Sequence, residues 1–287
     1  PTVESHPYNL RKPKRNDTAI TSKYALAATI IGAGEANSVV HPDTGKTQEY
    51  RHLIHGPDRQ KWTTSFANEF GRLAQGIGNR IVGTNTIFFT HKIDVPFETK
   101  KVTYGKIVCS IKPHKAETHR TRLTVGGNLL DFNGKLTTPT ATVTTAKCLF
   151  NSVVSTNNAK YATADVKNFY LNNTLPEPEY TKMQLSIIPE ETIAQYQLKK
   201  IVNTNGWVYT KIYKGMYGLK QAAILAYDNL QKNLKPFGYS PVVGIVGMWK
   251  HETRHITFCL CVDGFGIKYT TKQDAHHSLD VIGTSYK

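Results

Sequence analysis

Large apolar residues recur three or four positions apart between residues 61 and 77, as they do along one face of a helix. The residues with this spacing are Trp62, Phe66, Phe70, Leu73 and Ile77. The pattern predicts a helix that packs this face in a core and stops at the glycines that follow. Further helical patterns cover residues 145–154, a short segment from Glu190, and residues 221–234. In the first of these, we expect Leu149, Phe150 and Val153 to be buried.

Short β-branched or alternating segments between the helices predict strands. They cover residues 86–90, 106–111, 120–125, 183–187 and 207–213. Two more segments, 161–170 and 258–269, each combine a strand pattern with a single carboxylate, Asp165 in the first and Asp263 in the second. This mixture of elements predicts an α+β fold with a mainly antiparallel sheet flanked by helices.

Asp165 and Asp263 suggest a metal site. Two strands paired in one sheet bring carboxylates from distant parts of a sequence to the same hard cation, and Mg²⁺ held in this way serves phosphoryl or nucleotidyl transfer. A plainer interpretation is open for each residue. Asp263-Gly264 is a typical type I′ hairpin turn with glycine at positive φ, and Asp165 suits a turn or a helix cap. The interpretations are compatible, because a turn on a rigid sheet also presents a carboxylate.

The charge balance favours a nucleic-acid partner. The chain has 36 Lys and Arg against 21 Asp and Glu, a formal net charge of +15. Such a surface attracts phosphates, although a solvated basic surface without a partner has the same composition. Residues 1–49 are expected to form a basic N-terminal arm and linker, mobile over residues 1–16 and with a short helix within residues 18–40.

The cysteines and the apolar segments bear on location. The four cysteines, at positions 109, 148, 259 and 261, have no metal-site spacing, so buried free thiols in a reducing compartment are expected. No run approaches the roughly 18 apolar residues of a membrane span, and no signal peptide is visible. We therefore expect an intracellular protein, cytoplasmic or nuclear, without a membrane partner. Because the chain starts at Pro1, it is expected to be a piece of a longer polyprotein.

Four blocks in order carry a family resemblance. They are Thr118-His-Arg-Thr-Arg-Leu-Thr-Val-Gly-Gly-Asn128, Ala164-Asp-Val-Lys-Asn-Phe-Tyr-Leu-Asn172, Lys214-Gly-Met-Tyr-Gly-Leu-Lys-Gln-Ala222 and Val262-Asp-Gly-Phe-Gly-Ile-Lys-Tyr269. Together they resemble the reverse transcriptase of copia-type retrotransposon polyproteins. The resemblance spans residues 102–287, and residues 50–58 with the helix after them are similar too. It implies a domain over residues 50–287 with the fingers and palm of a right-hand polymerase, truncated before the thumb.

The resemblance also implies a mechanism, RNA-directed DNA synthesis by two-metal nucleotidyl transfer. Asp165, Asp263 and the main-chain carbonyl of Val166 would hold two Mg²⁺ ions, or Mn²⁺ in their place. The implied partners are an RNA or DNA template-primer, deoxynucleoside triphosphates and the rest of the retroelement polyprotein.

Four further residues would bind the nucleotide. Arg120 and Arg122 alternate onto one strand face, where guanidinium groups grip a triphosphate. Tyr170 would lie under the sugar and exclude a ribose hydroxyl, and Gln221 would use its amide and the helix-terminal N–H groups. Without the resemblance, the plain alternatives are solvated arginines, a core tyrosine and a helix-start glutamine.

Gly264 departs from the family pattern, which has two adjacent aspartates where this chain has Asp263-Gly264. Losing a carboxylate that helps to balance two divalent cations costs about a hundredfold in rate. Two hypotheses follow: an impaired RNA-directed DNA polymerase, or a non-catalytic nucleic-acid-binding remnant of a retroelement.

Overall fold

The computed structural model describes residues 39–286 except 42, 115, 133, 135 and 136. The arm expected at residues 1–16 lies outside the described residues, as does the helix expected at residues 18–40 apart from its last two positions. The described chain divides into two compact units. Unit 1 contains the residues up to Trp62 and Val108–Thr121, and unit 2 contains Thr63–Ile107 and the residues from Arg122 onward.

Unit 1 includes aromatic and ionic contacts between the start of helix α3 (Arg59–Leu73) and His119. It contains helix α2 (Tyr50–Leu53) and the first turn of α3. The rings of Trp62 and His119 meet edge to face, 4.7 Å apart. Asp58 pairs with Lys61 at 2.8 Å and with His119 at 3.4 Å, and the hydrogen bond from Lys61 is the main cause of its lowered pKa.

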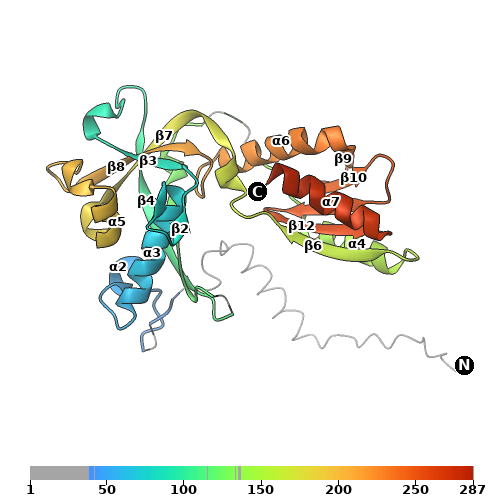
Figure 1. Cartoon of the computed structure of the whole chain (residues 1–287), viewed down its shortest axis with the longest axis horizontal. Helices are drawn as coiled ribbons and strands as arrows, with labels where there is room; N and C mark the ends of the chain where they lie inside the picture. Colours follow the sequence, from blue (N-terminus) through green and yellow to red (C-terminus); the bar gives the residue numbers. More distant parts are fainter. Residues whose placement is uncertain (1–38, 42, 115, 133, 135–136, 287) are drawn as a thin grey trace, which may run out of the picture. The chain divides into compact units, whose positions relative to one another are not determined.

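Unit 2 contains two five-stranded sheets (Figure 1). One has the order β3-β8-β7-β4-β5, and the ends of β4 and β5 at their connecting turn belong to unit 1. Its strands are β3 (Ile87–Thr90), β8 (Trp207–Lys214), β7 (Thr174–Gln184), β4 (Val102–Ile111) and β5 (His119–Val125). The pairs β3–β8 and β7–β8 are antiparallel, whereas β4–β7 is parallel. Other short elements include β1 (Gly76–Ile77), β2 (Ile81–Val82) and α5 (Glu190–Gln195).

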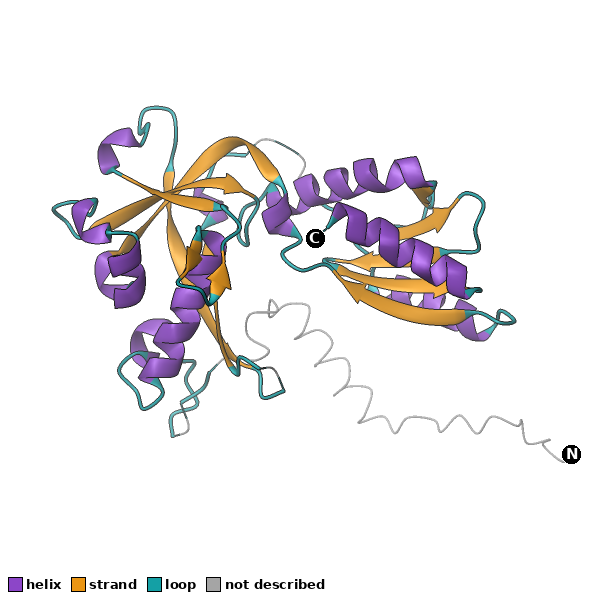
Figure 2. Cartoon of the chain, in the orientation of Figure 1, coloured by secondary structure: helices purple, strands orange, loops and turns teal. Residues whose placement is uncertain are grey.

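The other sheet has the order β6-β12-β11-β10-β9 and is antiparallel throughout. Its strands are β6 (Lys160–Asp165), β12 (Gly264–Tyr269), β11 (Thr257–Cys261), β10 (Met248–His251) and β9 (Tyr239–Pro241). Helices α6 (Ala222–Leu234) and α7 (Lys272–Ser285) cover one face of this sheet, and α4 (Val143–Val154) covers the other (Figure 2). The fold is therefore mixed α+β with mainly antiparallel strand pairing, as the patterning predicts.

Alternation along the strands separates the two faces of this second sheet. Phe258, Leu260, Phe265 and Ile267 are at most 2% exposed and pack with α6 and α7 in one core. The intervening positions, Cys259, Cys261 and Gly266, lie on the side of α4. None of the described helices is both long enough and apolar enough to cross a membrane.

Several expected elements differ from the structure. Helix α3 ends at Leu73 rather than Ile77, because Gly76 has φ +114° and starts the short strand β1. Strand β7 ends at Gln184, so the strand expected at residues 183–187 is mostly a 3-10 turn. Leu149 is buried, but Phe150 is 55% exposed and Val153 is half-buried, so the expectation that all three are buried is wrong for Phe150 and only partly right for Val153.

Candidate active site

The register of the second sheet brings the two aspartates together. Strands β6 and β12 pair antiparallel, with Asp165 directly opposite Gly264. The next residue, Val166, is buried, and its N–H donates to the main-chain oxygen of Asp263 at 3.0 Å. Asp165 therefore ends its strand beside the turn that contains Asp263, as the metal-site interpretation requires.

The hairpin turn differs from the expected one. Cys261 pairs with Gly264, so Val262 and Asp263 form a two-residue connection. The residue with positive φ is Val262, at +61°, whereas Gly264 lies in the strand with φ outside the left-handed region. The prediction that Gly264 supplies positive φ is therefore wrong. A β-branched residue in this conformation costs about 1–3 kcal/mol, and such strain is typical of functional sites.

Both carboxylates are uncommitted within the described chain. Asp165 is exposed and Asp263 is half-buried, and among the described residues neither side chain has a hydrogen bond or an ion pair. The described residues also contain no group of three or more His, Cys, Asp or Glu that could hold a metal. A cation at this edge would depend on two carboxylates and on main-chain oxygens, which are hard donors that suit Mg²⁺.

Tyr170 is close enough to Asp263 for the charge of that carboxylate to act on its hydroxyl. It begins the 3-10 turn η3 (Tyr170–Asn172) and is half-buried. Burial raises the pKa of its hydroxyl, and the nearby negative charge of Asp263 raises it further. A neutral phenol near Asp263 can pack against a ligand without adding charge.

Arg122 reaches the same area through a tyrosine that the sequence interpretation missed. Its guanidinium carbon is 3.9 Å from the centre of the Tyr217 ring, and that ring meets the Tyr170 ring edge to face at 5.4 Å and 87°. Three residues from three separate blocks are thus in contact. The only sequence signal for Tyr217 is its position between two glycines in the third block.

The other two predicted nucleotide ligands have different surroundings. Gln221 is buried at the start of α6, where its side-chain amide donates to Glu179 at 3.1 Å. Arg120 alternates with Arg122 along β5 as expected, but it belongs to unit 1, so the site described here is confined to unit 2. Both remain predicted ligands.

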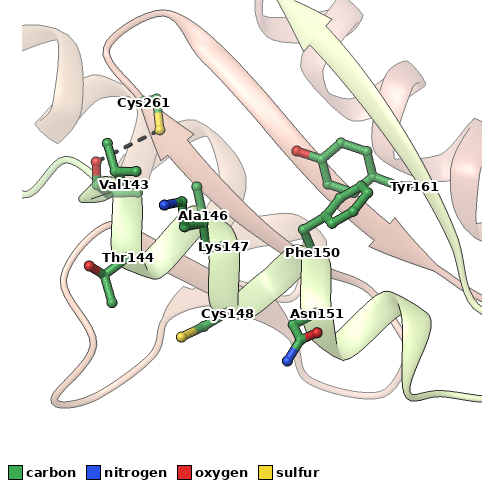
Figure 3. Close-up of a pocket in the computed structure, with 10 residues that line it drawn as sticks. Val143, Thr144, Ala146, Lys147, Cys148, Phe150, Asn151, Tyr161 and Cys261 are labelled. Carbon is green, nitrogen blue, oxygen red and sulfur yellow. Dashed lines mark hydrogen bonds between the residues drawn. The ribbon is translucent and has the colours of Figure 1, made fainter. Parts of the chain in front are cut away.

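The side of the sheet that faces α4 holds a cavity of about 800 Å³ (Figure 3). Cys148 of α4 and Cys261 of β11 line it, and both are exposed free thiols, so the expectation of buried cysteines is wrong for these two. Phe150 meets the ring of Tyr161 edge to face at 5.5 Å. The lining of the cavity is mainly apolar but includes Lys147, and none of the described residues that line it is acidic, so it offers no carboxylate to a hard cation.

Comparison of the chain with protein-family models and with curated proteins gives no match.

Proposed function

We propose that the chain is a reverse-transcriptase-like domain of a copia-type retrotransposon polyprotein, which synthesises DNA on a template and is impaired by Gly264. One observation carries the proposal: Asp165 stands opposite Gly264 across β6 and β12, beside the turn that presents Asp263. In this proposal the sheet β6-β12-β11-β10-β9 is the palm, and the sheet β3-β8-β7-β4-β5 belongs to the fingers.

Asp165, Asp263 and the main-chain carbonyl of Val166 would hold a pair of Mg²⁺ ions, because their oxygens are hard donors. When bound, the ions would make the primer 3′-hydroxyl more acidic and neutralise the pyrophosphate that leaves. In the proposed reaction the 3′-hydroxyl would lose its proton to water, and its oxygen would bond to the α-phosphorus as the bond from that phosphorus to the pyrophosphate oxygen breaks. The lack of a carboxylate at Gly264 weakens the balance of charge at this step.

The protein's own side chains would position the nucleotide. Arg122 presents a planar guanidinium group suited to phosphate oxygens, and its ring contact with Tyr217 limits its movement. Tyr170 would pack against the sugar and leave no room for a 2′-hydroxyl, which selects deoxynucleotides. Gln221 is proposed as a further contact, and Arg120 stays a ligand that the family resemblance implies.

A primer-extension assay tests the catalytic part of the proposal. The purified chain should add deoxynucleotides to a primer on an RNA or DNA template only when Mg²⁺ or Mn²⁺ is present. Nucleic-acid binding is measured in parallel, and several phosphate contacts should lower affinity about a hundredfold when salt rises fourfold. Affinity that does not change with salt would count against a nucleic-acid partner.

A second candidate function rests on Gly264 itself. The departure from the family pattern removes one carboxylate and leaves the β6–β12 pairing intact, as expected for a non-catalytic nucleic-acid-binding remnant. Salt-dependent binding without extension, both in this chain and in Gly264→Asp, would favour the remnant over the enzyme.

A further inference from the structure

The loop between β8 and α6, residues 215–221, is held tightly against the end of β5. The N–H of Val125 donates to the main-chain oxygen of Tyr217 at 2.9 Å. Gly218 has φ +96°, and a Cβ atom there would lie 2.1 Å from the oxygen of Val125. A Cβ atom on Gly127 would lie 2.0 Å from the oxygen of Gly218. These approaches leave no space for a methyl group, so the backbone of Tyr217 is fixed beside the strand that carries Arg122.

The same loop is also held against the turn that carries Tyr170. The N–H of Gly215 donates to the oxygen of Asn173 at 2.7 Å, and a Cβ atom on Gly215 would lie 2.9 Å from the oxygen of Tyr170. The side-chain amide of Asn173 donates back to the oxygen of Phe169 at 2.7 Å. The loop therefore connects two segments that are distant in sequence, one with Arg122 and one with Tyr170.

The side chain of Tyr217 makes the same connection. The Arg122 guanidinium lies over the face of its ring, within the range of a cation–π contact, and the Tyr170 ring meets it edge to face. Neither contact requires the hydroxyl group. A flat, half-buried ring on a fixed backbone thus supports both the cation and the second ring.

We propose that Tyr217 is a positioning residue that holds Arg122 and Tyr170 in one fixed relation, so that triphosphate binding and exclusion of the ribose hydroxyl depend on the same ring. The inference rests on the proposed function. Replacing the ring by an aliphatic side chain frees both neighbours, so it should weaken nucleotide binding and sugar selection together. If Tyr217 only filled space, replacing its ring by an aliphatic side chain of similar size would leave the sugar selection unchanged.

The test measures the binding of dATP and ATP, with Mg²⁺, to a complex of the protein with a primer-template. The primer ends in a dideoxynucleotide, and the next template base, which is unpaired, is T. Tyr217→Leu should bind dATP about tenfold more weakly, and its ratio of dATP to ATP affinity should fall at least about fivefold. Tyr217→Phe should stay within about twofold of the parent on both measures. The ratio does not depend on how much of a preparation is folded, so partial unfolding cannot imitate the result.

Tyr213→Leu is a matched control. Tyr213 also meets an aromatic ring edge to face, Phe88 at 5.3 Å, and also has a cation over its ring, Lys211 at 4.9 Å. The ratio of dATP to ATP affinity in Tyr213→Leu should equal that of the parent. Unchanged affinity and ratio in Tyr217→Leu, with a parent that binds dATP, would overturn the inference and leave the proposed function standing. A parent that binds no dATP would overturn both.

Discussion

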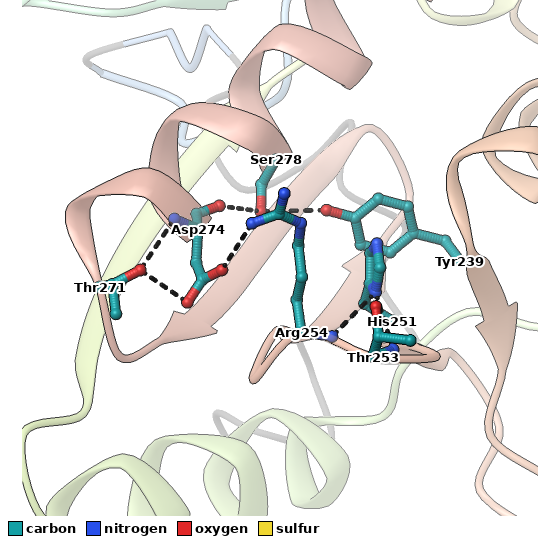
Figure 4. A network of polar contacts seen from close by, with 7 residues as sticks. All are labelled: Tyr239, His251, Thr253, Arg254, Thr271, Asp274 and Ser278. Atoms are coloured by element: carbon teal, nitrogen blue, oxygen red, sulfur yellow. Dashed lines mark hydrogen bonds and ion pairs between the residues drawn. The ribbon is translucent and has the colours of Figure 1, made fainter.

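Asp274 and the pair Asp165 and Asp263 all lie in unit 2, but their surroundings differ. Asp274, in the first turn of α7, accepts hydrogen bonds from the Thr271 hydroxyl at 2.8 Å and from Arg254 at 3.2 Å (Figure 4). Its main-chain oxygen accepts from Ser278, whose hydroxyl also contacts that of Tyr239. Burial alone would raise the pKa of Asp274, but the bonds from Thr271 and Arg254 lower it overall.

The other two aspartates have no such partners within the described chain, and the turn between β11 and β12 contains a valine at positive φ. A carboxylate that stabilises a fold is normally hydrogen-bonded, whereas one that serves a ligand must keep its oxygens available. The comparison therefore separates a structural carboxylate from two that are available for chemistry, and substitutions at the two places should have opposite consequences.

The largest expected effect is at Asp165. Asp165→Asn keeps the shape of the side chain and removes its charge, so Mg²⁺-dependent extension should fall by about a thousandfold or more. The free energy of unfolding should change by less than about 0.5 kcal/mol, because the side chain is exposed and has no hydrogen-bond or ion-pair partner among the described residues. Primer extension and chemical denaturation measure the two quantities. If Asp165→Asn extended primers at the parent rate, Asp165 would not be part of the catalytic site.

Gly264→Asp should have the next largest effect. Its φ is outside the left-handed region, and an added Cβ atom would first meet the oxygen of Cys261 at 3.6 Å, an ordinary contact. An aspartate therefore fits in the strand opposite Asp165 and should raise nucleotide incorporation by about a hundredfold.

Gly264→Asn is the control for this substitution, because it adds nearly the same volume without the charge. Single-nucleotide incorporation on one primer-template, at matched binding, compares the three proteins. A gain that is equal in Asn and Asp variants would mean that shape, not charge, limits the parent.

Asp274→Ala should show the reverse pattern to Asp165→Asn. It removes the carboxylate that accepts from Thr271 and Arg254, which should lower the free energy of unfolding by about 1–3 kcal/mol. Extension per folded molecule should not change, because no part of the proposed site is altered. Urea denaturation followed by circular dichroism measures the loss. Unchanged stability would show that the polar network does not hold α7 in place.

The pairing of the two aspartate strands could be predicted, but the details of the turn could not. Connections at 262–263 and at 263–264 both leave Leu260 and Phe265 facing the same core, so alternation does not distinguish them. The strand β11 is held by residues far away in sequence: Leu260 donates to Gly247 at 2.9 Å and accepts from Ala141 at 2.7 Å. These contacts have no local sequence signal.

The exposure of Phe150 on α4 and the contacts of Tyr217 could not be predicted either, because they also depend on contacts between distant segments. A helical stripe shows which residues share a face, but not whether that face is covered, and Phe150 lies outside the covered stripe that Leu149 occupies. Tyr217 acquires its neighbours through close approaches of glycine backbones, which depend on tertiary packing. Helix α7 has a weak apolar pattern and was not predicted at all.

The smallest expected effect is the pH dependence of the Asp274 region. The ring of His277 on α7 stacks on Tyr239 at 5.8 Å and meets His251 at 5.3 Å. Its Nε2 atom is buried without a hydrogen-bond partner among the described residues. Burial, followed by the positive charge of Arg254 and the neighbouring His251, lowers the pKa of His277, and the carboxylates of Asp274 and Asp280 only partly oppose this.

A histidine whose pKa is lower in the folded than in the unfolded state binds protons preferentially when unfolded. Its contribution to stability is therefore complete above the unfolded pKa of about 6.5 and is lost as pH falls through the folded value. Stability should decline between pH 7 and pH 5, and the decline should be shallower in His277→Gln than in the parent. His276→Gln, at the exposed neighbouring position, should decline like the parent. Denaturation curves at several pH values measure the free energy of unfolding of each protein. The difference between the parent and His277→Gln cancels the contributions of other groups. Parallel curves for the parent and His277→Gln would show that protonation at His277 does not act on the fold.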